Sequence, residues 1–191
     1  GCKVVSRIKG THPALKSELM VFDTLTGAMT ALVNCDWITA RRTGAVATLA
    51  INTLRCSTAS VYAFVGLGVM AHATLDCFLA TNTDRPITIR LKRYKDQAEA
   101  TALRYGNAPN VTFEIADSME QLVEGADVVV SCITDADGLM VGNVDLFQPG
   151  GLVVPVHTRG FQNCDRVFDK VYADDEGHVS GFRYFNEFRS F

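Results

Sequence analysis

A twelve-residue segment, residues 60–71, constrains the fold of this chain most strongly. Its sequence, SVYAFVGLGVMA, joins an apolar run to a pair of glycines and then to the start of a helical pattern. Gly66, Gly68 and Ala71 have the G-x-G-x-x-A spacing of dinucleotide-binding turns. In such turns the first glycine allows a tight bend, the second lets the backbone approach a pyrophosphate, and the small third residue lets helix and strand pack closely. The phosphates then lie over the free N–H groups at the start of the helix.

The chain after this turn alternates short apolar runs with helical segments. Runs rich in β-branched residues indicate buried strands, and the segments between them indicate helices. We expect strands over residues 61–65, 87–91, 111–115, 127–133, 150–156 and, more weakly, 167–173. We expect helices over residues 69–80, 95–105 and 118–124, the last with Asp117 or Ser118 as N-cap and Gly125 at its end. This alternation predicts an α/β fold, a Rossmann-type doubly wound parallel sheet.

The first part of the chain has a different pattern. We expect a strand over residues 3–8, a hairpin of residues 18–23 and 29–34 that turns at Gly27, and one long helix over residues 36–54 capped by Asp36. A hairpin and one helix bury too little apolar area to form a domain alone. The sequence therefore predicts part of a second α+β domain for substrate binding and dimerisation over residues 1–57, a dinucleotide-binding domain over residues 58–174, and a truncated return segment over residues 175–191.

Composition excludes several classes of function. The 191 residues are 48% hydrophobic and 20% charged, with scattered charges and a net charge of −3, so no basic face for nucleic acid is expected. The apolar runs are too short to span a membrane. The six cysteines are widely spaced, with no C-x-x-C pair and no metal-ligand spacing. We therefore expect reduced cysteines, no bound metal and a cytoplasmic protein.

The second predicted strand ends in a basic segment. NAD-specific folds usually have an acidic residue here that binds the ribose 2′-hydroxyl. This chain instead has Lys92 and Arg93, and its first acidic residue is Asp96. Cations at this point suit the 2′-phosphate of NADP, with Arg93 as the bidentate ligand, although a solvated loop with incidental charge has the same pattern. NADP is the expected cofactor, and NAD remains possible.

Two adjacent arginines, Arg41 and Arg42, lie near the start of the long predicted helix, and small residues follow them. Small residues let a helix pack closely against another backbone. An arginine that points into a cleft at this position would bind a carboxylate through its planar guanidinium. The alternative is that both arginines are surface residues.

The order and separation of several motifs extend this interpretation. They are TGAMTAL at residues 26–32, WITARRTGAV at 37–46, the glycine turn, and GADVVV at 125–130. In this respect the chain resembles the ornithine cyclodeaminase/μ-crystallin family. The resemblance implies nicotinamide-dependent hydride transfer at the α-carbon of a small amino or imino acid, and a homodimer formed through the substrate domain. Members of that family are about half as long again, so we expect segments to be missing at both ends.

The resemblance also implies roles for individual residues. Lys3 matches a lysine that meets the substrate carboxylate and assists proton transfer, Arg42 matches the carboxylate-binding arginine, and Thr43 matches a threonine that contacts the cofactor phosphate. Two cations would then hold the carboxylate while hydride moves at the adjacent carbon. The cofactor-binding residues expected are Thr43, Gly66, Leu67, Gly68, Val69, Met70, Ala71, Lys92, Arg93 and Thr134.

One position departs from the family pattern. In cyclodeaminases the strand that corresponds to residues 152–156 leads to an aspartate used in acid–base catalysis, whereas this chain has His157 and Arg159 there and no carboxylate before Asp165. An arginine cannot perform that proton chemistry, and His157 is the remaining candidate. We therefore expect a reductase or dehydrogenase that acts on an amino or imino acid other than ornithine, with Arg159 available for a second carboxylate. The alternatives are a non-catalytic, crystallin-like NADP-binding protein and an inactive fragment of the enzyme.

Overall fold

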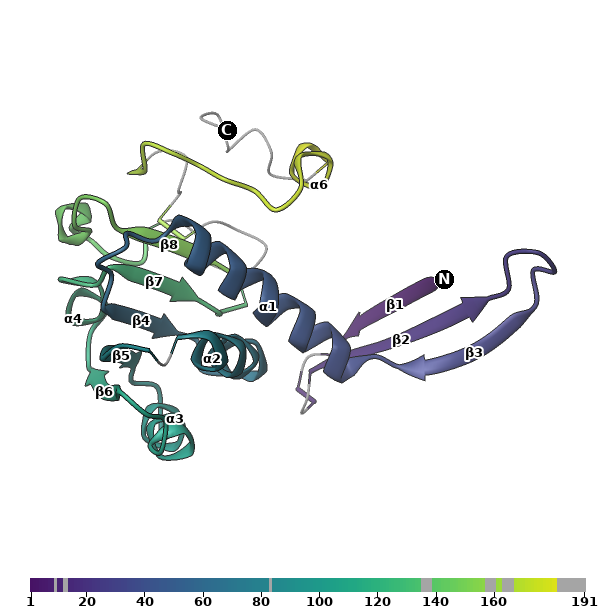
Figure 1. Ribbon diagram of the computed structural model, residues 1–191, viewed down its shortest axis with the longest axis horizontal. Coiled ribbons are helices and arrows are strands. Elements are labelled where there is room, and N and C mark those ends of the chain that lie inside the picture. The colour runs from purple at the N-terminus through teal and green to yellow at the C-terminus, as the bar shows by residue number, and fades with distance from the viewer. Residues whose placement is uncertain are drawn as a thin grey trace.

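The computed structural model contains a three-stranded sheet and a five-stranded sheet, which a long helix connects (Figure 1). It describes residues 1–8, 10–11, 14–82, 84–134, 139–156, 161–162 and 167–181. In Figure 1 the three-stranded sheet extends away from the body that the five-stranded sheet forms.

The larger sheet is parallel and has the order β6-β5-β4-β7-β8. Its strands are β4 (Val61–Val65), β5 (Ile87–Lys92), β6 (Val111–Ala116), β7 (Val128–Ser131) and β8 (Leu152–Pro155). The chain runs outward from β4 through β5 to β6, and then returns to the other side of β4 to form β7 and β8. This order confirms the prediction of a Rossmann-type doubly wound sheet, and it places the topological switch point between β4 and β7.

Helices cover both faces of this sheet. They are α1 (Asp36–Leu54), α2 (Val69–Thr81) and α3 (Gln97–Tyr105) on one face, and α4 (Met119–Val123) on the other. Because side chains alternate along a strand, Tyr62 and Phe64 of β4 pack with the first group, while Ala63 and Val65 pack on the side of α4. Burial on both faces explains why β4 and β7 are almost continuously apolar, whereas β5 and β6 alternate apolar with polar residues. Ser118 is the N-cap of α4 and forms a capping box with Gln121.

The smaller sheet is antiparallel, with the order β1-β2-β3. Its strands are β1 (Cys2–Arg7), β2 (Leu15–Phe22) and β3 (Met29–Asn34). The turn between β2 and β3 contains Gly27 with a φ of +72°, as expected. The helix α1 then runs from this sheet along α2 to the start of β4 (Figure 1).

Two sequence predictions about local structure are wrong. Asp36 does not cap α1: the N-cap is Cys35, and the carboxylate of Asp36 instead accepts a hydrogen bond from the backbone N–H of Ser17 at 2.6 Å. The weak strand expected over residues 167–173 is absent, since none of those residues is in a strand. Asp169 and Lys170 interrupt the apolar pattern there. The structure also has a short 3-10 helix (Val144–Leu146) and α6 (Glu176–Ser180), which were not predicted.

Candidate functional site

The glycine turn lies at the switch point of the parallel sheet, between the ends of β4 and β7. Gly66 has a φ of +81°, and a β-carbon there would lie 2.6 Å from the backbone nitrogen of Ile133. Both the backbone conformation and the close approach require glycine at this position. The turn is therefore in direct contact with the segment that follows β7.

Gly68 has the opposite environment. A β-carbon there would meet no atom within 4 Å, and Gly68 is the N-cap of α2, where no side chain caps the helix. The first N–H groups of this thirteen-residue helix thus adjoin open space, as a pyrophosphate site requires. Ala71 is 1% exposed and packs in the core, which fits the small third position of the motif. Of the other predicted cofactor residues in the turn, Leu67 is buried, Met70 is half-buried and Val69 is exposed.

The predicted cations at the end of β5 are both held by neighbouring groups. Lys92 Nζ donates to the carbonyl oxygens of Arg93 and Asp117, each at 3.0 Å. The guanidinium of Arg93 forms ion pairs with the carboxylates of Asp117 and Glu99. A 2′-phosphate bound here would share Arg93 with those two carboxylates.

The predicted substrate residues gather where β1 meets the first turns of α1. Lys3 Nζ donates to Thr39 Oγ1 at 3.4 Å, and the buried hydroxyl of Thr39 also contacts Ser17 Oγ at 2.9 Å. Thr43 Oγ1 donates to the carbonyl oxygen of Thr39 at 2.9 Å. Arg42, which is exposed, follows Thr39 by three residues and so lies on a neighbouring part of the helix surface. Lys3, Arg42 and Thr43 are therefore grouped around Thr39.

Arg7, on the same strand as Lys3, was not predicted as a site residue. Its guanidinium donates to Thr134 Oγ1 at 3.5 Å and thereby connects β1 to the segment after β7. Thr134, a predicted cofactor residue, is exposed at this point. The sequence did contain a signal for Arg7. Side chains alternate between the faces of a strand, so Lys3, Val5 and Arg7 share one face of the predicted strand.

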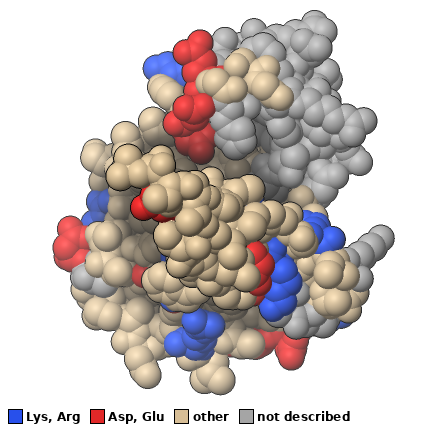
Figure 2. All heavy atoms as spheres, turned by 90° about the vertical axis from the view of Figure 1, so that its right-hand side faces the viewer, with Lys and Arg blue, Asp and Glu red and all other residues tan. Residues whose placement is uncertain are grey.

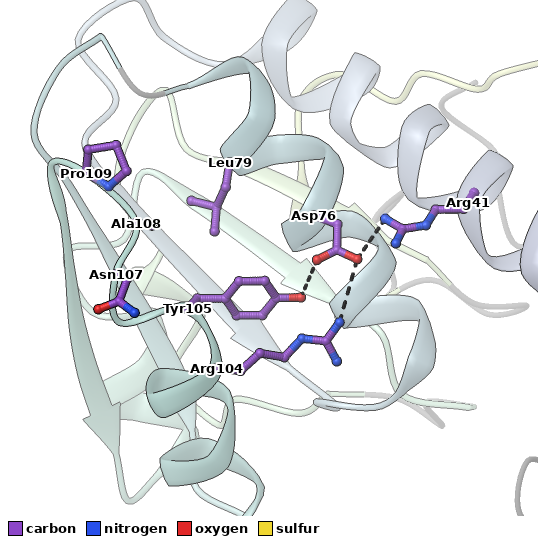
Figure 3. Close-up of a pocket in the computed structure, with 8 residues that line it drawn as sticks. All are labelled: Arg41, Asp76, Leu79, Arg104, Tyr105, Asn107, Ala108 and Pro109. Carbon is purple, nitrogen blue, oxygen red and sulfur yellow. Dashed lines mark hydrogen bonds and ion pairs between the residues drawn. The ribbon is translucent and has the colours of Figure 1, made fainter.

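Arg41 extends toward α2, at the flank of the parallel sheet. Figure 3 shows it directed at Asp76 of α2, with which it forms an ion pair at 2.7 Å. Asp76 also accepts a 2.7 Å hydrogen bond from the hydroxyl of Tyr105, and Arg104 lies 3.9 Å away. Burial, together with the hydrogen bond to Asp76, raises the pKa of Tyr105 above its usual value. These residues line an open pocket of roughly 490 Å³, which contains Arg41 but none of the residues to which the family resemblance gives a role.

The cysteine closest in sequence to the end of β7 is not a reactive thiol. Burial raises the pKa of Cys132 to about 12, so the group is protonated at neutral pH. Cys2, Cys35, Cys56, Cys77 and Cys132 are free. Within the described ranges, no cluster of His, Cys, Asp and Glu could hold a metal ion, and no helix is long and apolar enough to cross a membrane.

His157 and Arg159, the candidates at the end of β8, lie outside the described residues, as does Asp165. Their roles stay predictions.

Comparison with known proteins agrees with this arrangement. The parallel sheet and its glycine turn define a Rossmann-type nucleotide-binding fold. Residues 5–165 match the ornithine cyclodeaminase/mu-crystallin family model, and the chain belongs to this family. It is 23% identical over 138 residues to ketimine reductase mu-crystallin of Mus musculus, an alignment that covers 72% of this chain and 42% of that protein. The chain thus spans less than half the length of this relative.

Two solved structures share the fold. The Δ1-pyrroline-2-carboxylate reductase of Thermococcus litoralis, solved with NADH and L-proline, matches with a TM-score of 0.65 and 22% identity, covering 81% of this chain and 48% of that one. An archaeal alanine dehydrogenase dimer with bound NAD matches with a TM-score of 0.64 and 19% identity, covering 76% of this chain and 43% of that one.

Proposed function

We propose that this chain supplies the nucleotide site and part of the substrate site of an NAD(P)-dependent oxidoreductase or cyclodeaminase. The reaction is hydride transfer at the α-carbon of a small amino or imino acid. The observation that carries this proposal is the glycine turn, with open space at Gly68 above the start of α2. The activities named for its relatives, a ketimine reductase, a pyrroline carboxylate reductase and an alanine dehydrogenase, support it.

Each residue of the site has a distinct task in this proposal. A bound nicotinamide supplies or accepts the hydride. Lys3 and Arg42 hold the substrate carboxylate from two sides, and the ammonium of Lys3 provides a proton next to the reacting carbon. Thr43 contacts a cofactor phosphate beside the N–H groups of α2. His157 carries a second proton, and Arg159 is available for a second carboxylate of the substrate.

We further propose NADP as the preferred cofactor. Lys92 and Arg93 stand at the end of β5, where the adenosine ribose binds in this fold. Arg93 is exposed, so a phosphate could reach the guanidinium in addition to its carboxylate partners. NAD would bind without this contact and therefore more weakly.

We propose a cytoplasmic homodimer that pairs through the small sheet. In this proposal the nucleotide-binding domain covers residues 58–174, and residues 1–57 and 175–191 belong to the substrate and dimerisation domain. Large apolar side chains are exposed on and near this sheet, namely Val4, Val5, Met29, Leu32 and Trp37. Figure 2 looks onto the end of the molecule that carries the sheet and shows a largely uncharged surface at its centre. A second copy of the chain would bury such a surface. The free cysteines are consistent with a reducing compartment.

The first experiment measures NADPH and NADH binding by titration calorimetry. Gly68→Val places a side chain in the open space above α2, and we expect it to abolish binding without unfolding the protein. Gly142→Val is the matched control, because Gly142 is exposed and a β-carbon there also meets no atom within 4 Å. Unchanged affinity in Gly68→Val would contradict the nucleotide site.

The second experiment screens NADPH and NADH oxidation with cyclic imines, and with α-keto acids plus amines. Turnover of at least one such substrate is expected, and Arg42→Leu should raise its KM while nucleotide affinity stays the same. Tight nucleotide binding without any turnover would favour a non-catalytic, crystallin-like ligand-binding protein.

A further inference from the structure

We propose that Arg7 is a binding group for the second carboxylate of the substrate, a role for which the sequence alone offers Arg159, and that this makes the protein selective for dicarboxylic amino or imino acids. This inference rests on the proposed function, because it assigns a further specificity-determining residue to the same site.

The side chains of Lys3 and Arg7 point to the same side of the small sheet, because residues i and i+4 share a face of a strand. The pairing of β1 with β2 places Val5, midway between them, opposite Ser17. Ser17 is 1% exposed, and its hydroxyl contacts Thr39 of α1, so this face is the one that packs against α1. Arg7 therefore extends toward the parallel sheet from the face that carries Lys3.

The partner of Arg7 locates its guanidinium at the carboxyl end of β7. Thr134 follows Ile133, whose backbone nitrogen lies directly beside Gly66. Ligands of this fold bind in the crevice outside the carboxyl ends of the strands, at the switch point. The guanidinium of Arg7 thus stands at the edge of that crevice, on the side of the substrate residues.

The charge of Arg7 is not neutralised within the described part of the chain. Its single hydrogen bond there, at 3.5 Å, goes to a neutral hydroxyl, and no carboxylate pairs with it. Arg41 and Arg93 differ in this respect, since each forms an ion pair with a carboxylate. A guanidinium has five N–H donors, and among the described residues only one of those of Arg7 has a partner. A carboxylate is the anion that matches this group through two parallel hydrogen bonds.

The distance along β1 fits one ligand held at both ends. Four residues of a strand span ~13 Å between α-carbons, and the lysine and arginine side chains both reach several ångströms from the backbone. The Lys3 end would hold the α-carboxylate and the Arg7 end the distal carboxylate. The pyrophosphate of the cofactor has its own binding groups, the N–H groups at the start of α2.

The test compares Arg7→Gln with the unaltered protein on paired substrates. Oxaloacetate or 2-oxoglutarate with ammonia gives a dicarboxylic imine, and pyruvate with ammonia gives a monocarboxylic one. We expect the unaltered protein to prefer the dicarboxylic imines. In Arg7→Gln, kcat/KM for them should fall about 10–100-fold, mainly through KM, and should change less than about threefold for pyruvate. Arg7→Lys should recover part of the loss, and Ser6→Gln, on the opposite face of β1, should have no effect.

A binding measurement separates this inference from the proposed function. Succinate should raise the Tm of the nucleotide-bound protein more than butyrate does, and Arg7→Gln should remove the difference even if no substrate is turned over. If Arg7→Gln lowered kcat/KM equally for dicarboxylic and monocarboxylic substrates, the assignment to a second carboxylate would be overturned. Equal Tm shifts with succinate and butyrate in the unaltered protein would also overturn it. Weaker NADPH binding by Arg7→Gln in the absence of substrate would also overturn it, and would make Arg7 a cofactor residue.

Discussion

Gly44 of α1 lies directly against the backbone of Ala73 in α2. A β-carbon at position 44 would be 2.4 Å from the carbonyl carbon of Ala73. One turn further along, Thr48 Oγ1 donates to the carbonyl oxygen of Thr74 at 3.3 Å. The helix that carries Arg42 is thus fixed at backbone distance from the helix that begins at the glycine turn. This contact sets the position of the substrate residues relative to the nucleotide site.

We predict that Gly44→Ala lowers the free energy of unfolding by about 1–3 kcal/mol, because the added methyl group meets backbone atoms that cannot move independently. Urea unfolding measures the change. Ala45→Ser, at an exposed position next to it, should shift the value by less than about 0.5 kcal/mol. In an open helix, alanine would instead stabilise by up to about 1 kcal/mol relative to glycine, and such a gain would contradict the close contact.

Gly66 and Gly125 allow the stability cost of backbone strain to be measured separately from the cost of crowding. Gly66 and Gly125 both have positive φ, +81° and +69°, but only at Gly66 would an added β-carbon have backbone atoms within 3 Å. Gly125→Ala should cost about 1–2 kcal/mol from strain alone. Gly66→Ala should cost more by a further 1–3 kcal/mol or so, and should also weaken NADPH binding. Equal costs in urea unfolding would contradict the contact with the segment after β7.

Asp127 joins the starts of three parallel strands. Its Oδ2 accepts hydrogen bonds from the backbone N–H groups of Ser60 and Val61 at 2.7 and 2.8 Å, and its Oδ1 accepts from Gln148 Nε2 at 2.6 Å. Asp127→Ala leaves these donors without an acceptor, so we expect a loss of about 2–4 kcal/mol in thermal or urea unfolding. Asp127→Asn keeps one acceptor oxygen and should lose less. If Asp127→Asn lost as much stability as Asp127→Ala, the negative charge of Asp127, and not its hydrogen-bond acceptance, would be the stabilising property.

The parts of the fold that the sequence predicted well are those with local causes. The helix over residues 36–54 and the central strands follow from apolar patterns, Gly27 adopts the positive φ of its turn, and Gly125 follows the end of α4 as expected. The misplaced cap at Asp36 depends on a hydrogen bond to Ser17 in another strand. No local pattern contains such a contact.

The site shows the same division between local and distant causes. The glycine turn is predictable from its spacing, because the strand, the turn and the helix that it joins are contiguous in the sequence. The contact of Arg7 with Thr134 joins residues 127 positions apart, and only the folded chain brings them together. The pairing of Arg41 with Asp76, and the exposure of Arg42, likewise depend on how α1 packs against α2.

His72 gives the stability a specific pH dependence. Burial of the imidazole lowers its pKa below the usual 6.5, and the nearby charge of Arg104 lowers it further, against an opposing effect of Asp76. The folded protein therefore binds this proton more weakly than the unfolded chain, so stability falls as pH decreases through about 6.5. We expect the Tm of His72→Leu to fall less between pH 7 and pH 5 than that of the unaltered protein. Parallel Tm profiles would contradict this assignment.

Nucleotide preference offers a test in two directions, because Arg93 is shared between an expected phosphate and two carboxylates. Arg93→Ala removes the phosphate ligand, so the Kd of NADPH should rise about 10–100-fold while that of NADH changes little. Asp117→Asn removes a competing charge from the same guanidinium and should tighten NADPH binding, again with little effect on NADH. Calorimetric titration of both nucleotides measures the two ratios. If either variant changes both affinities equally, Lys92 and Arg93 are ordinary surface cations and the cofactor preference must come from another part of the site.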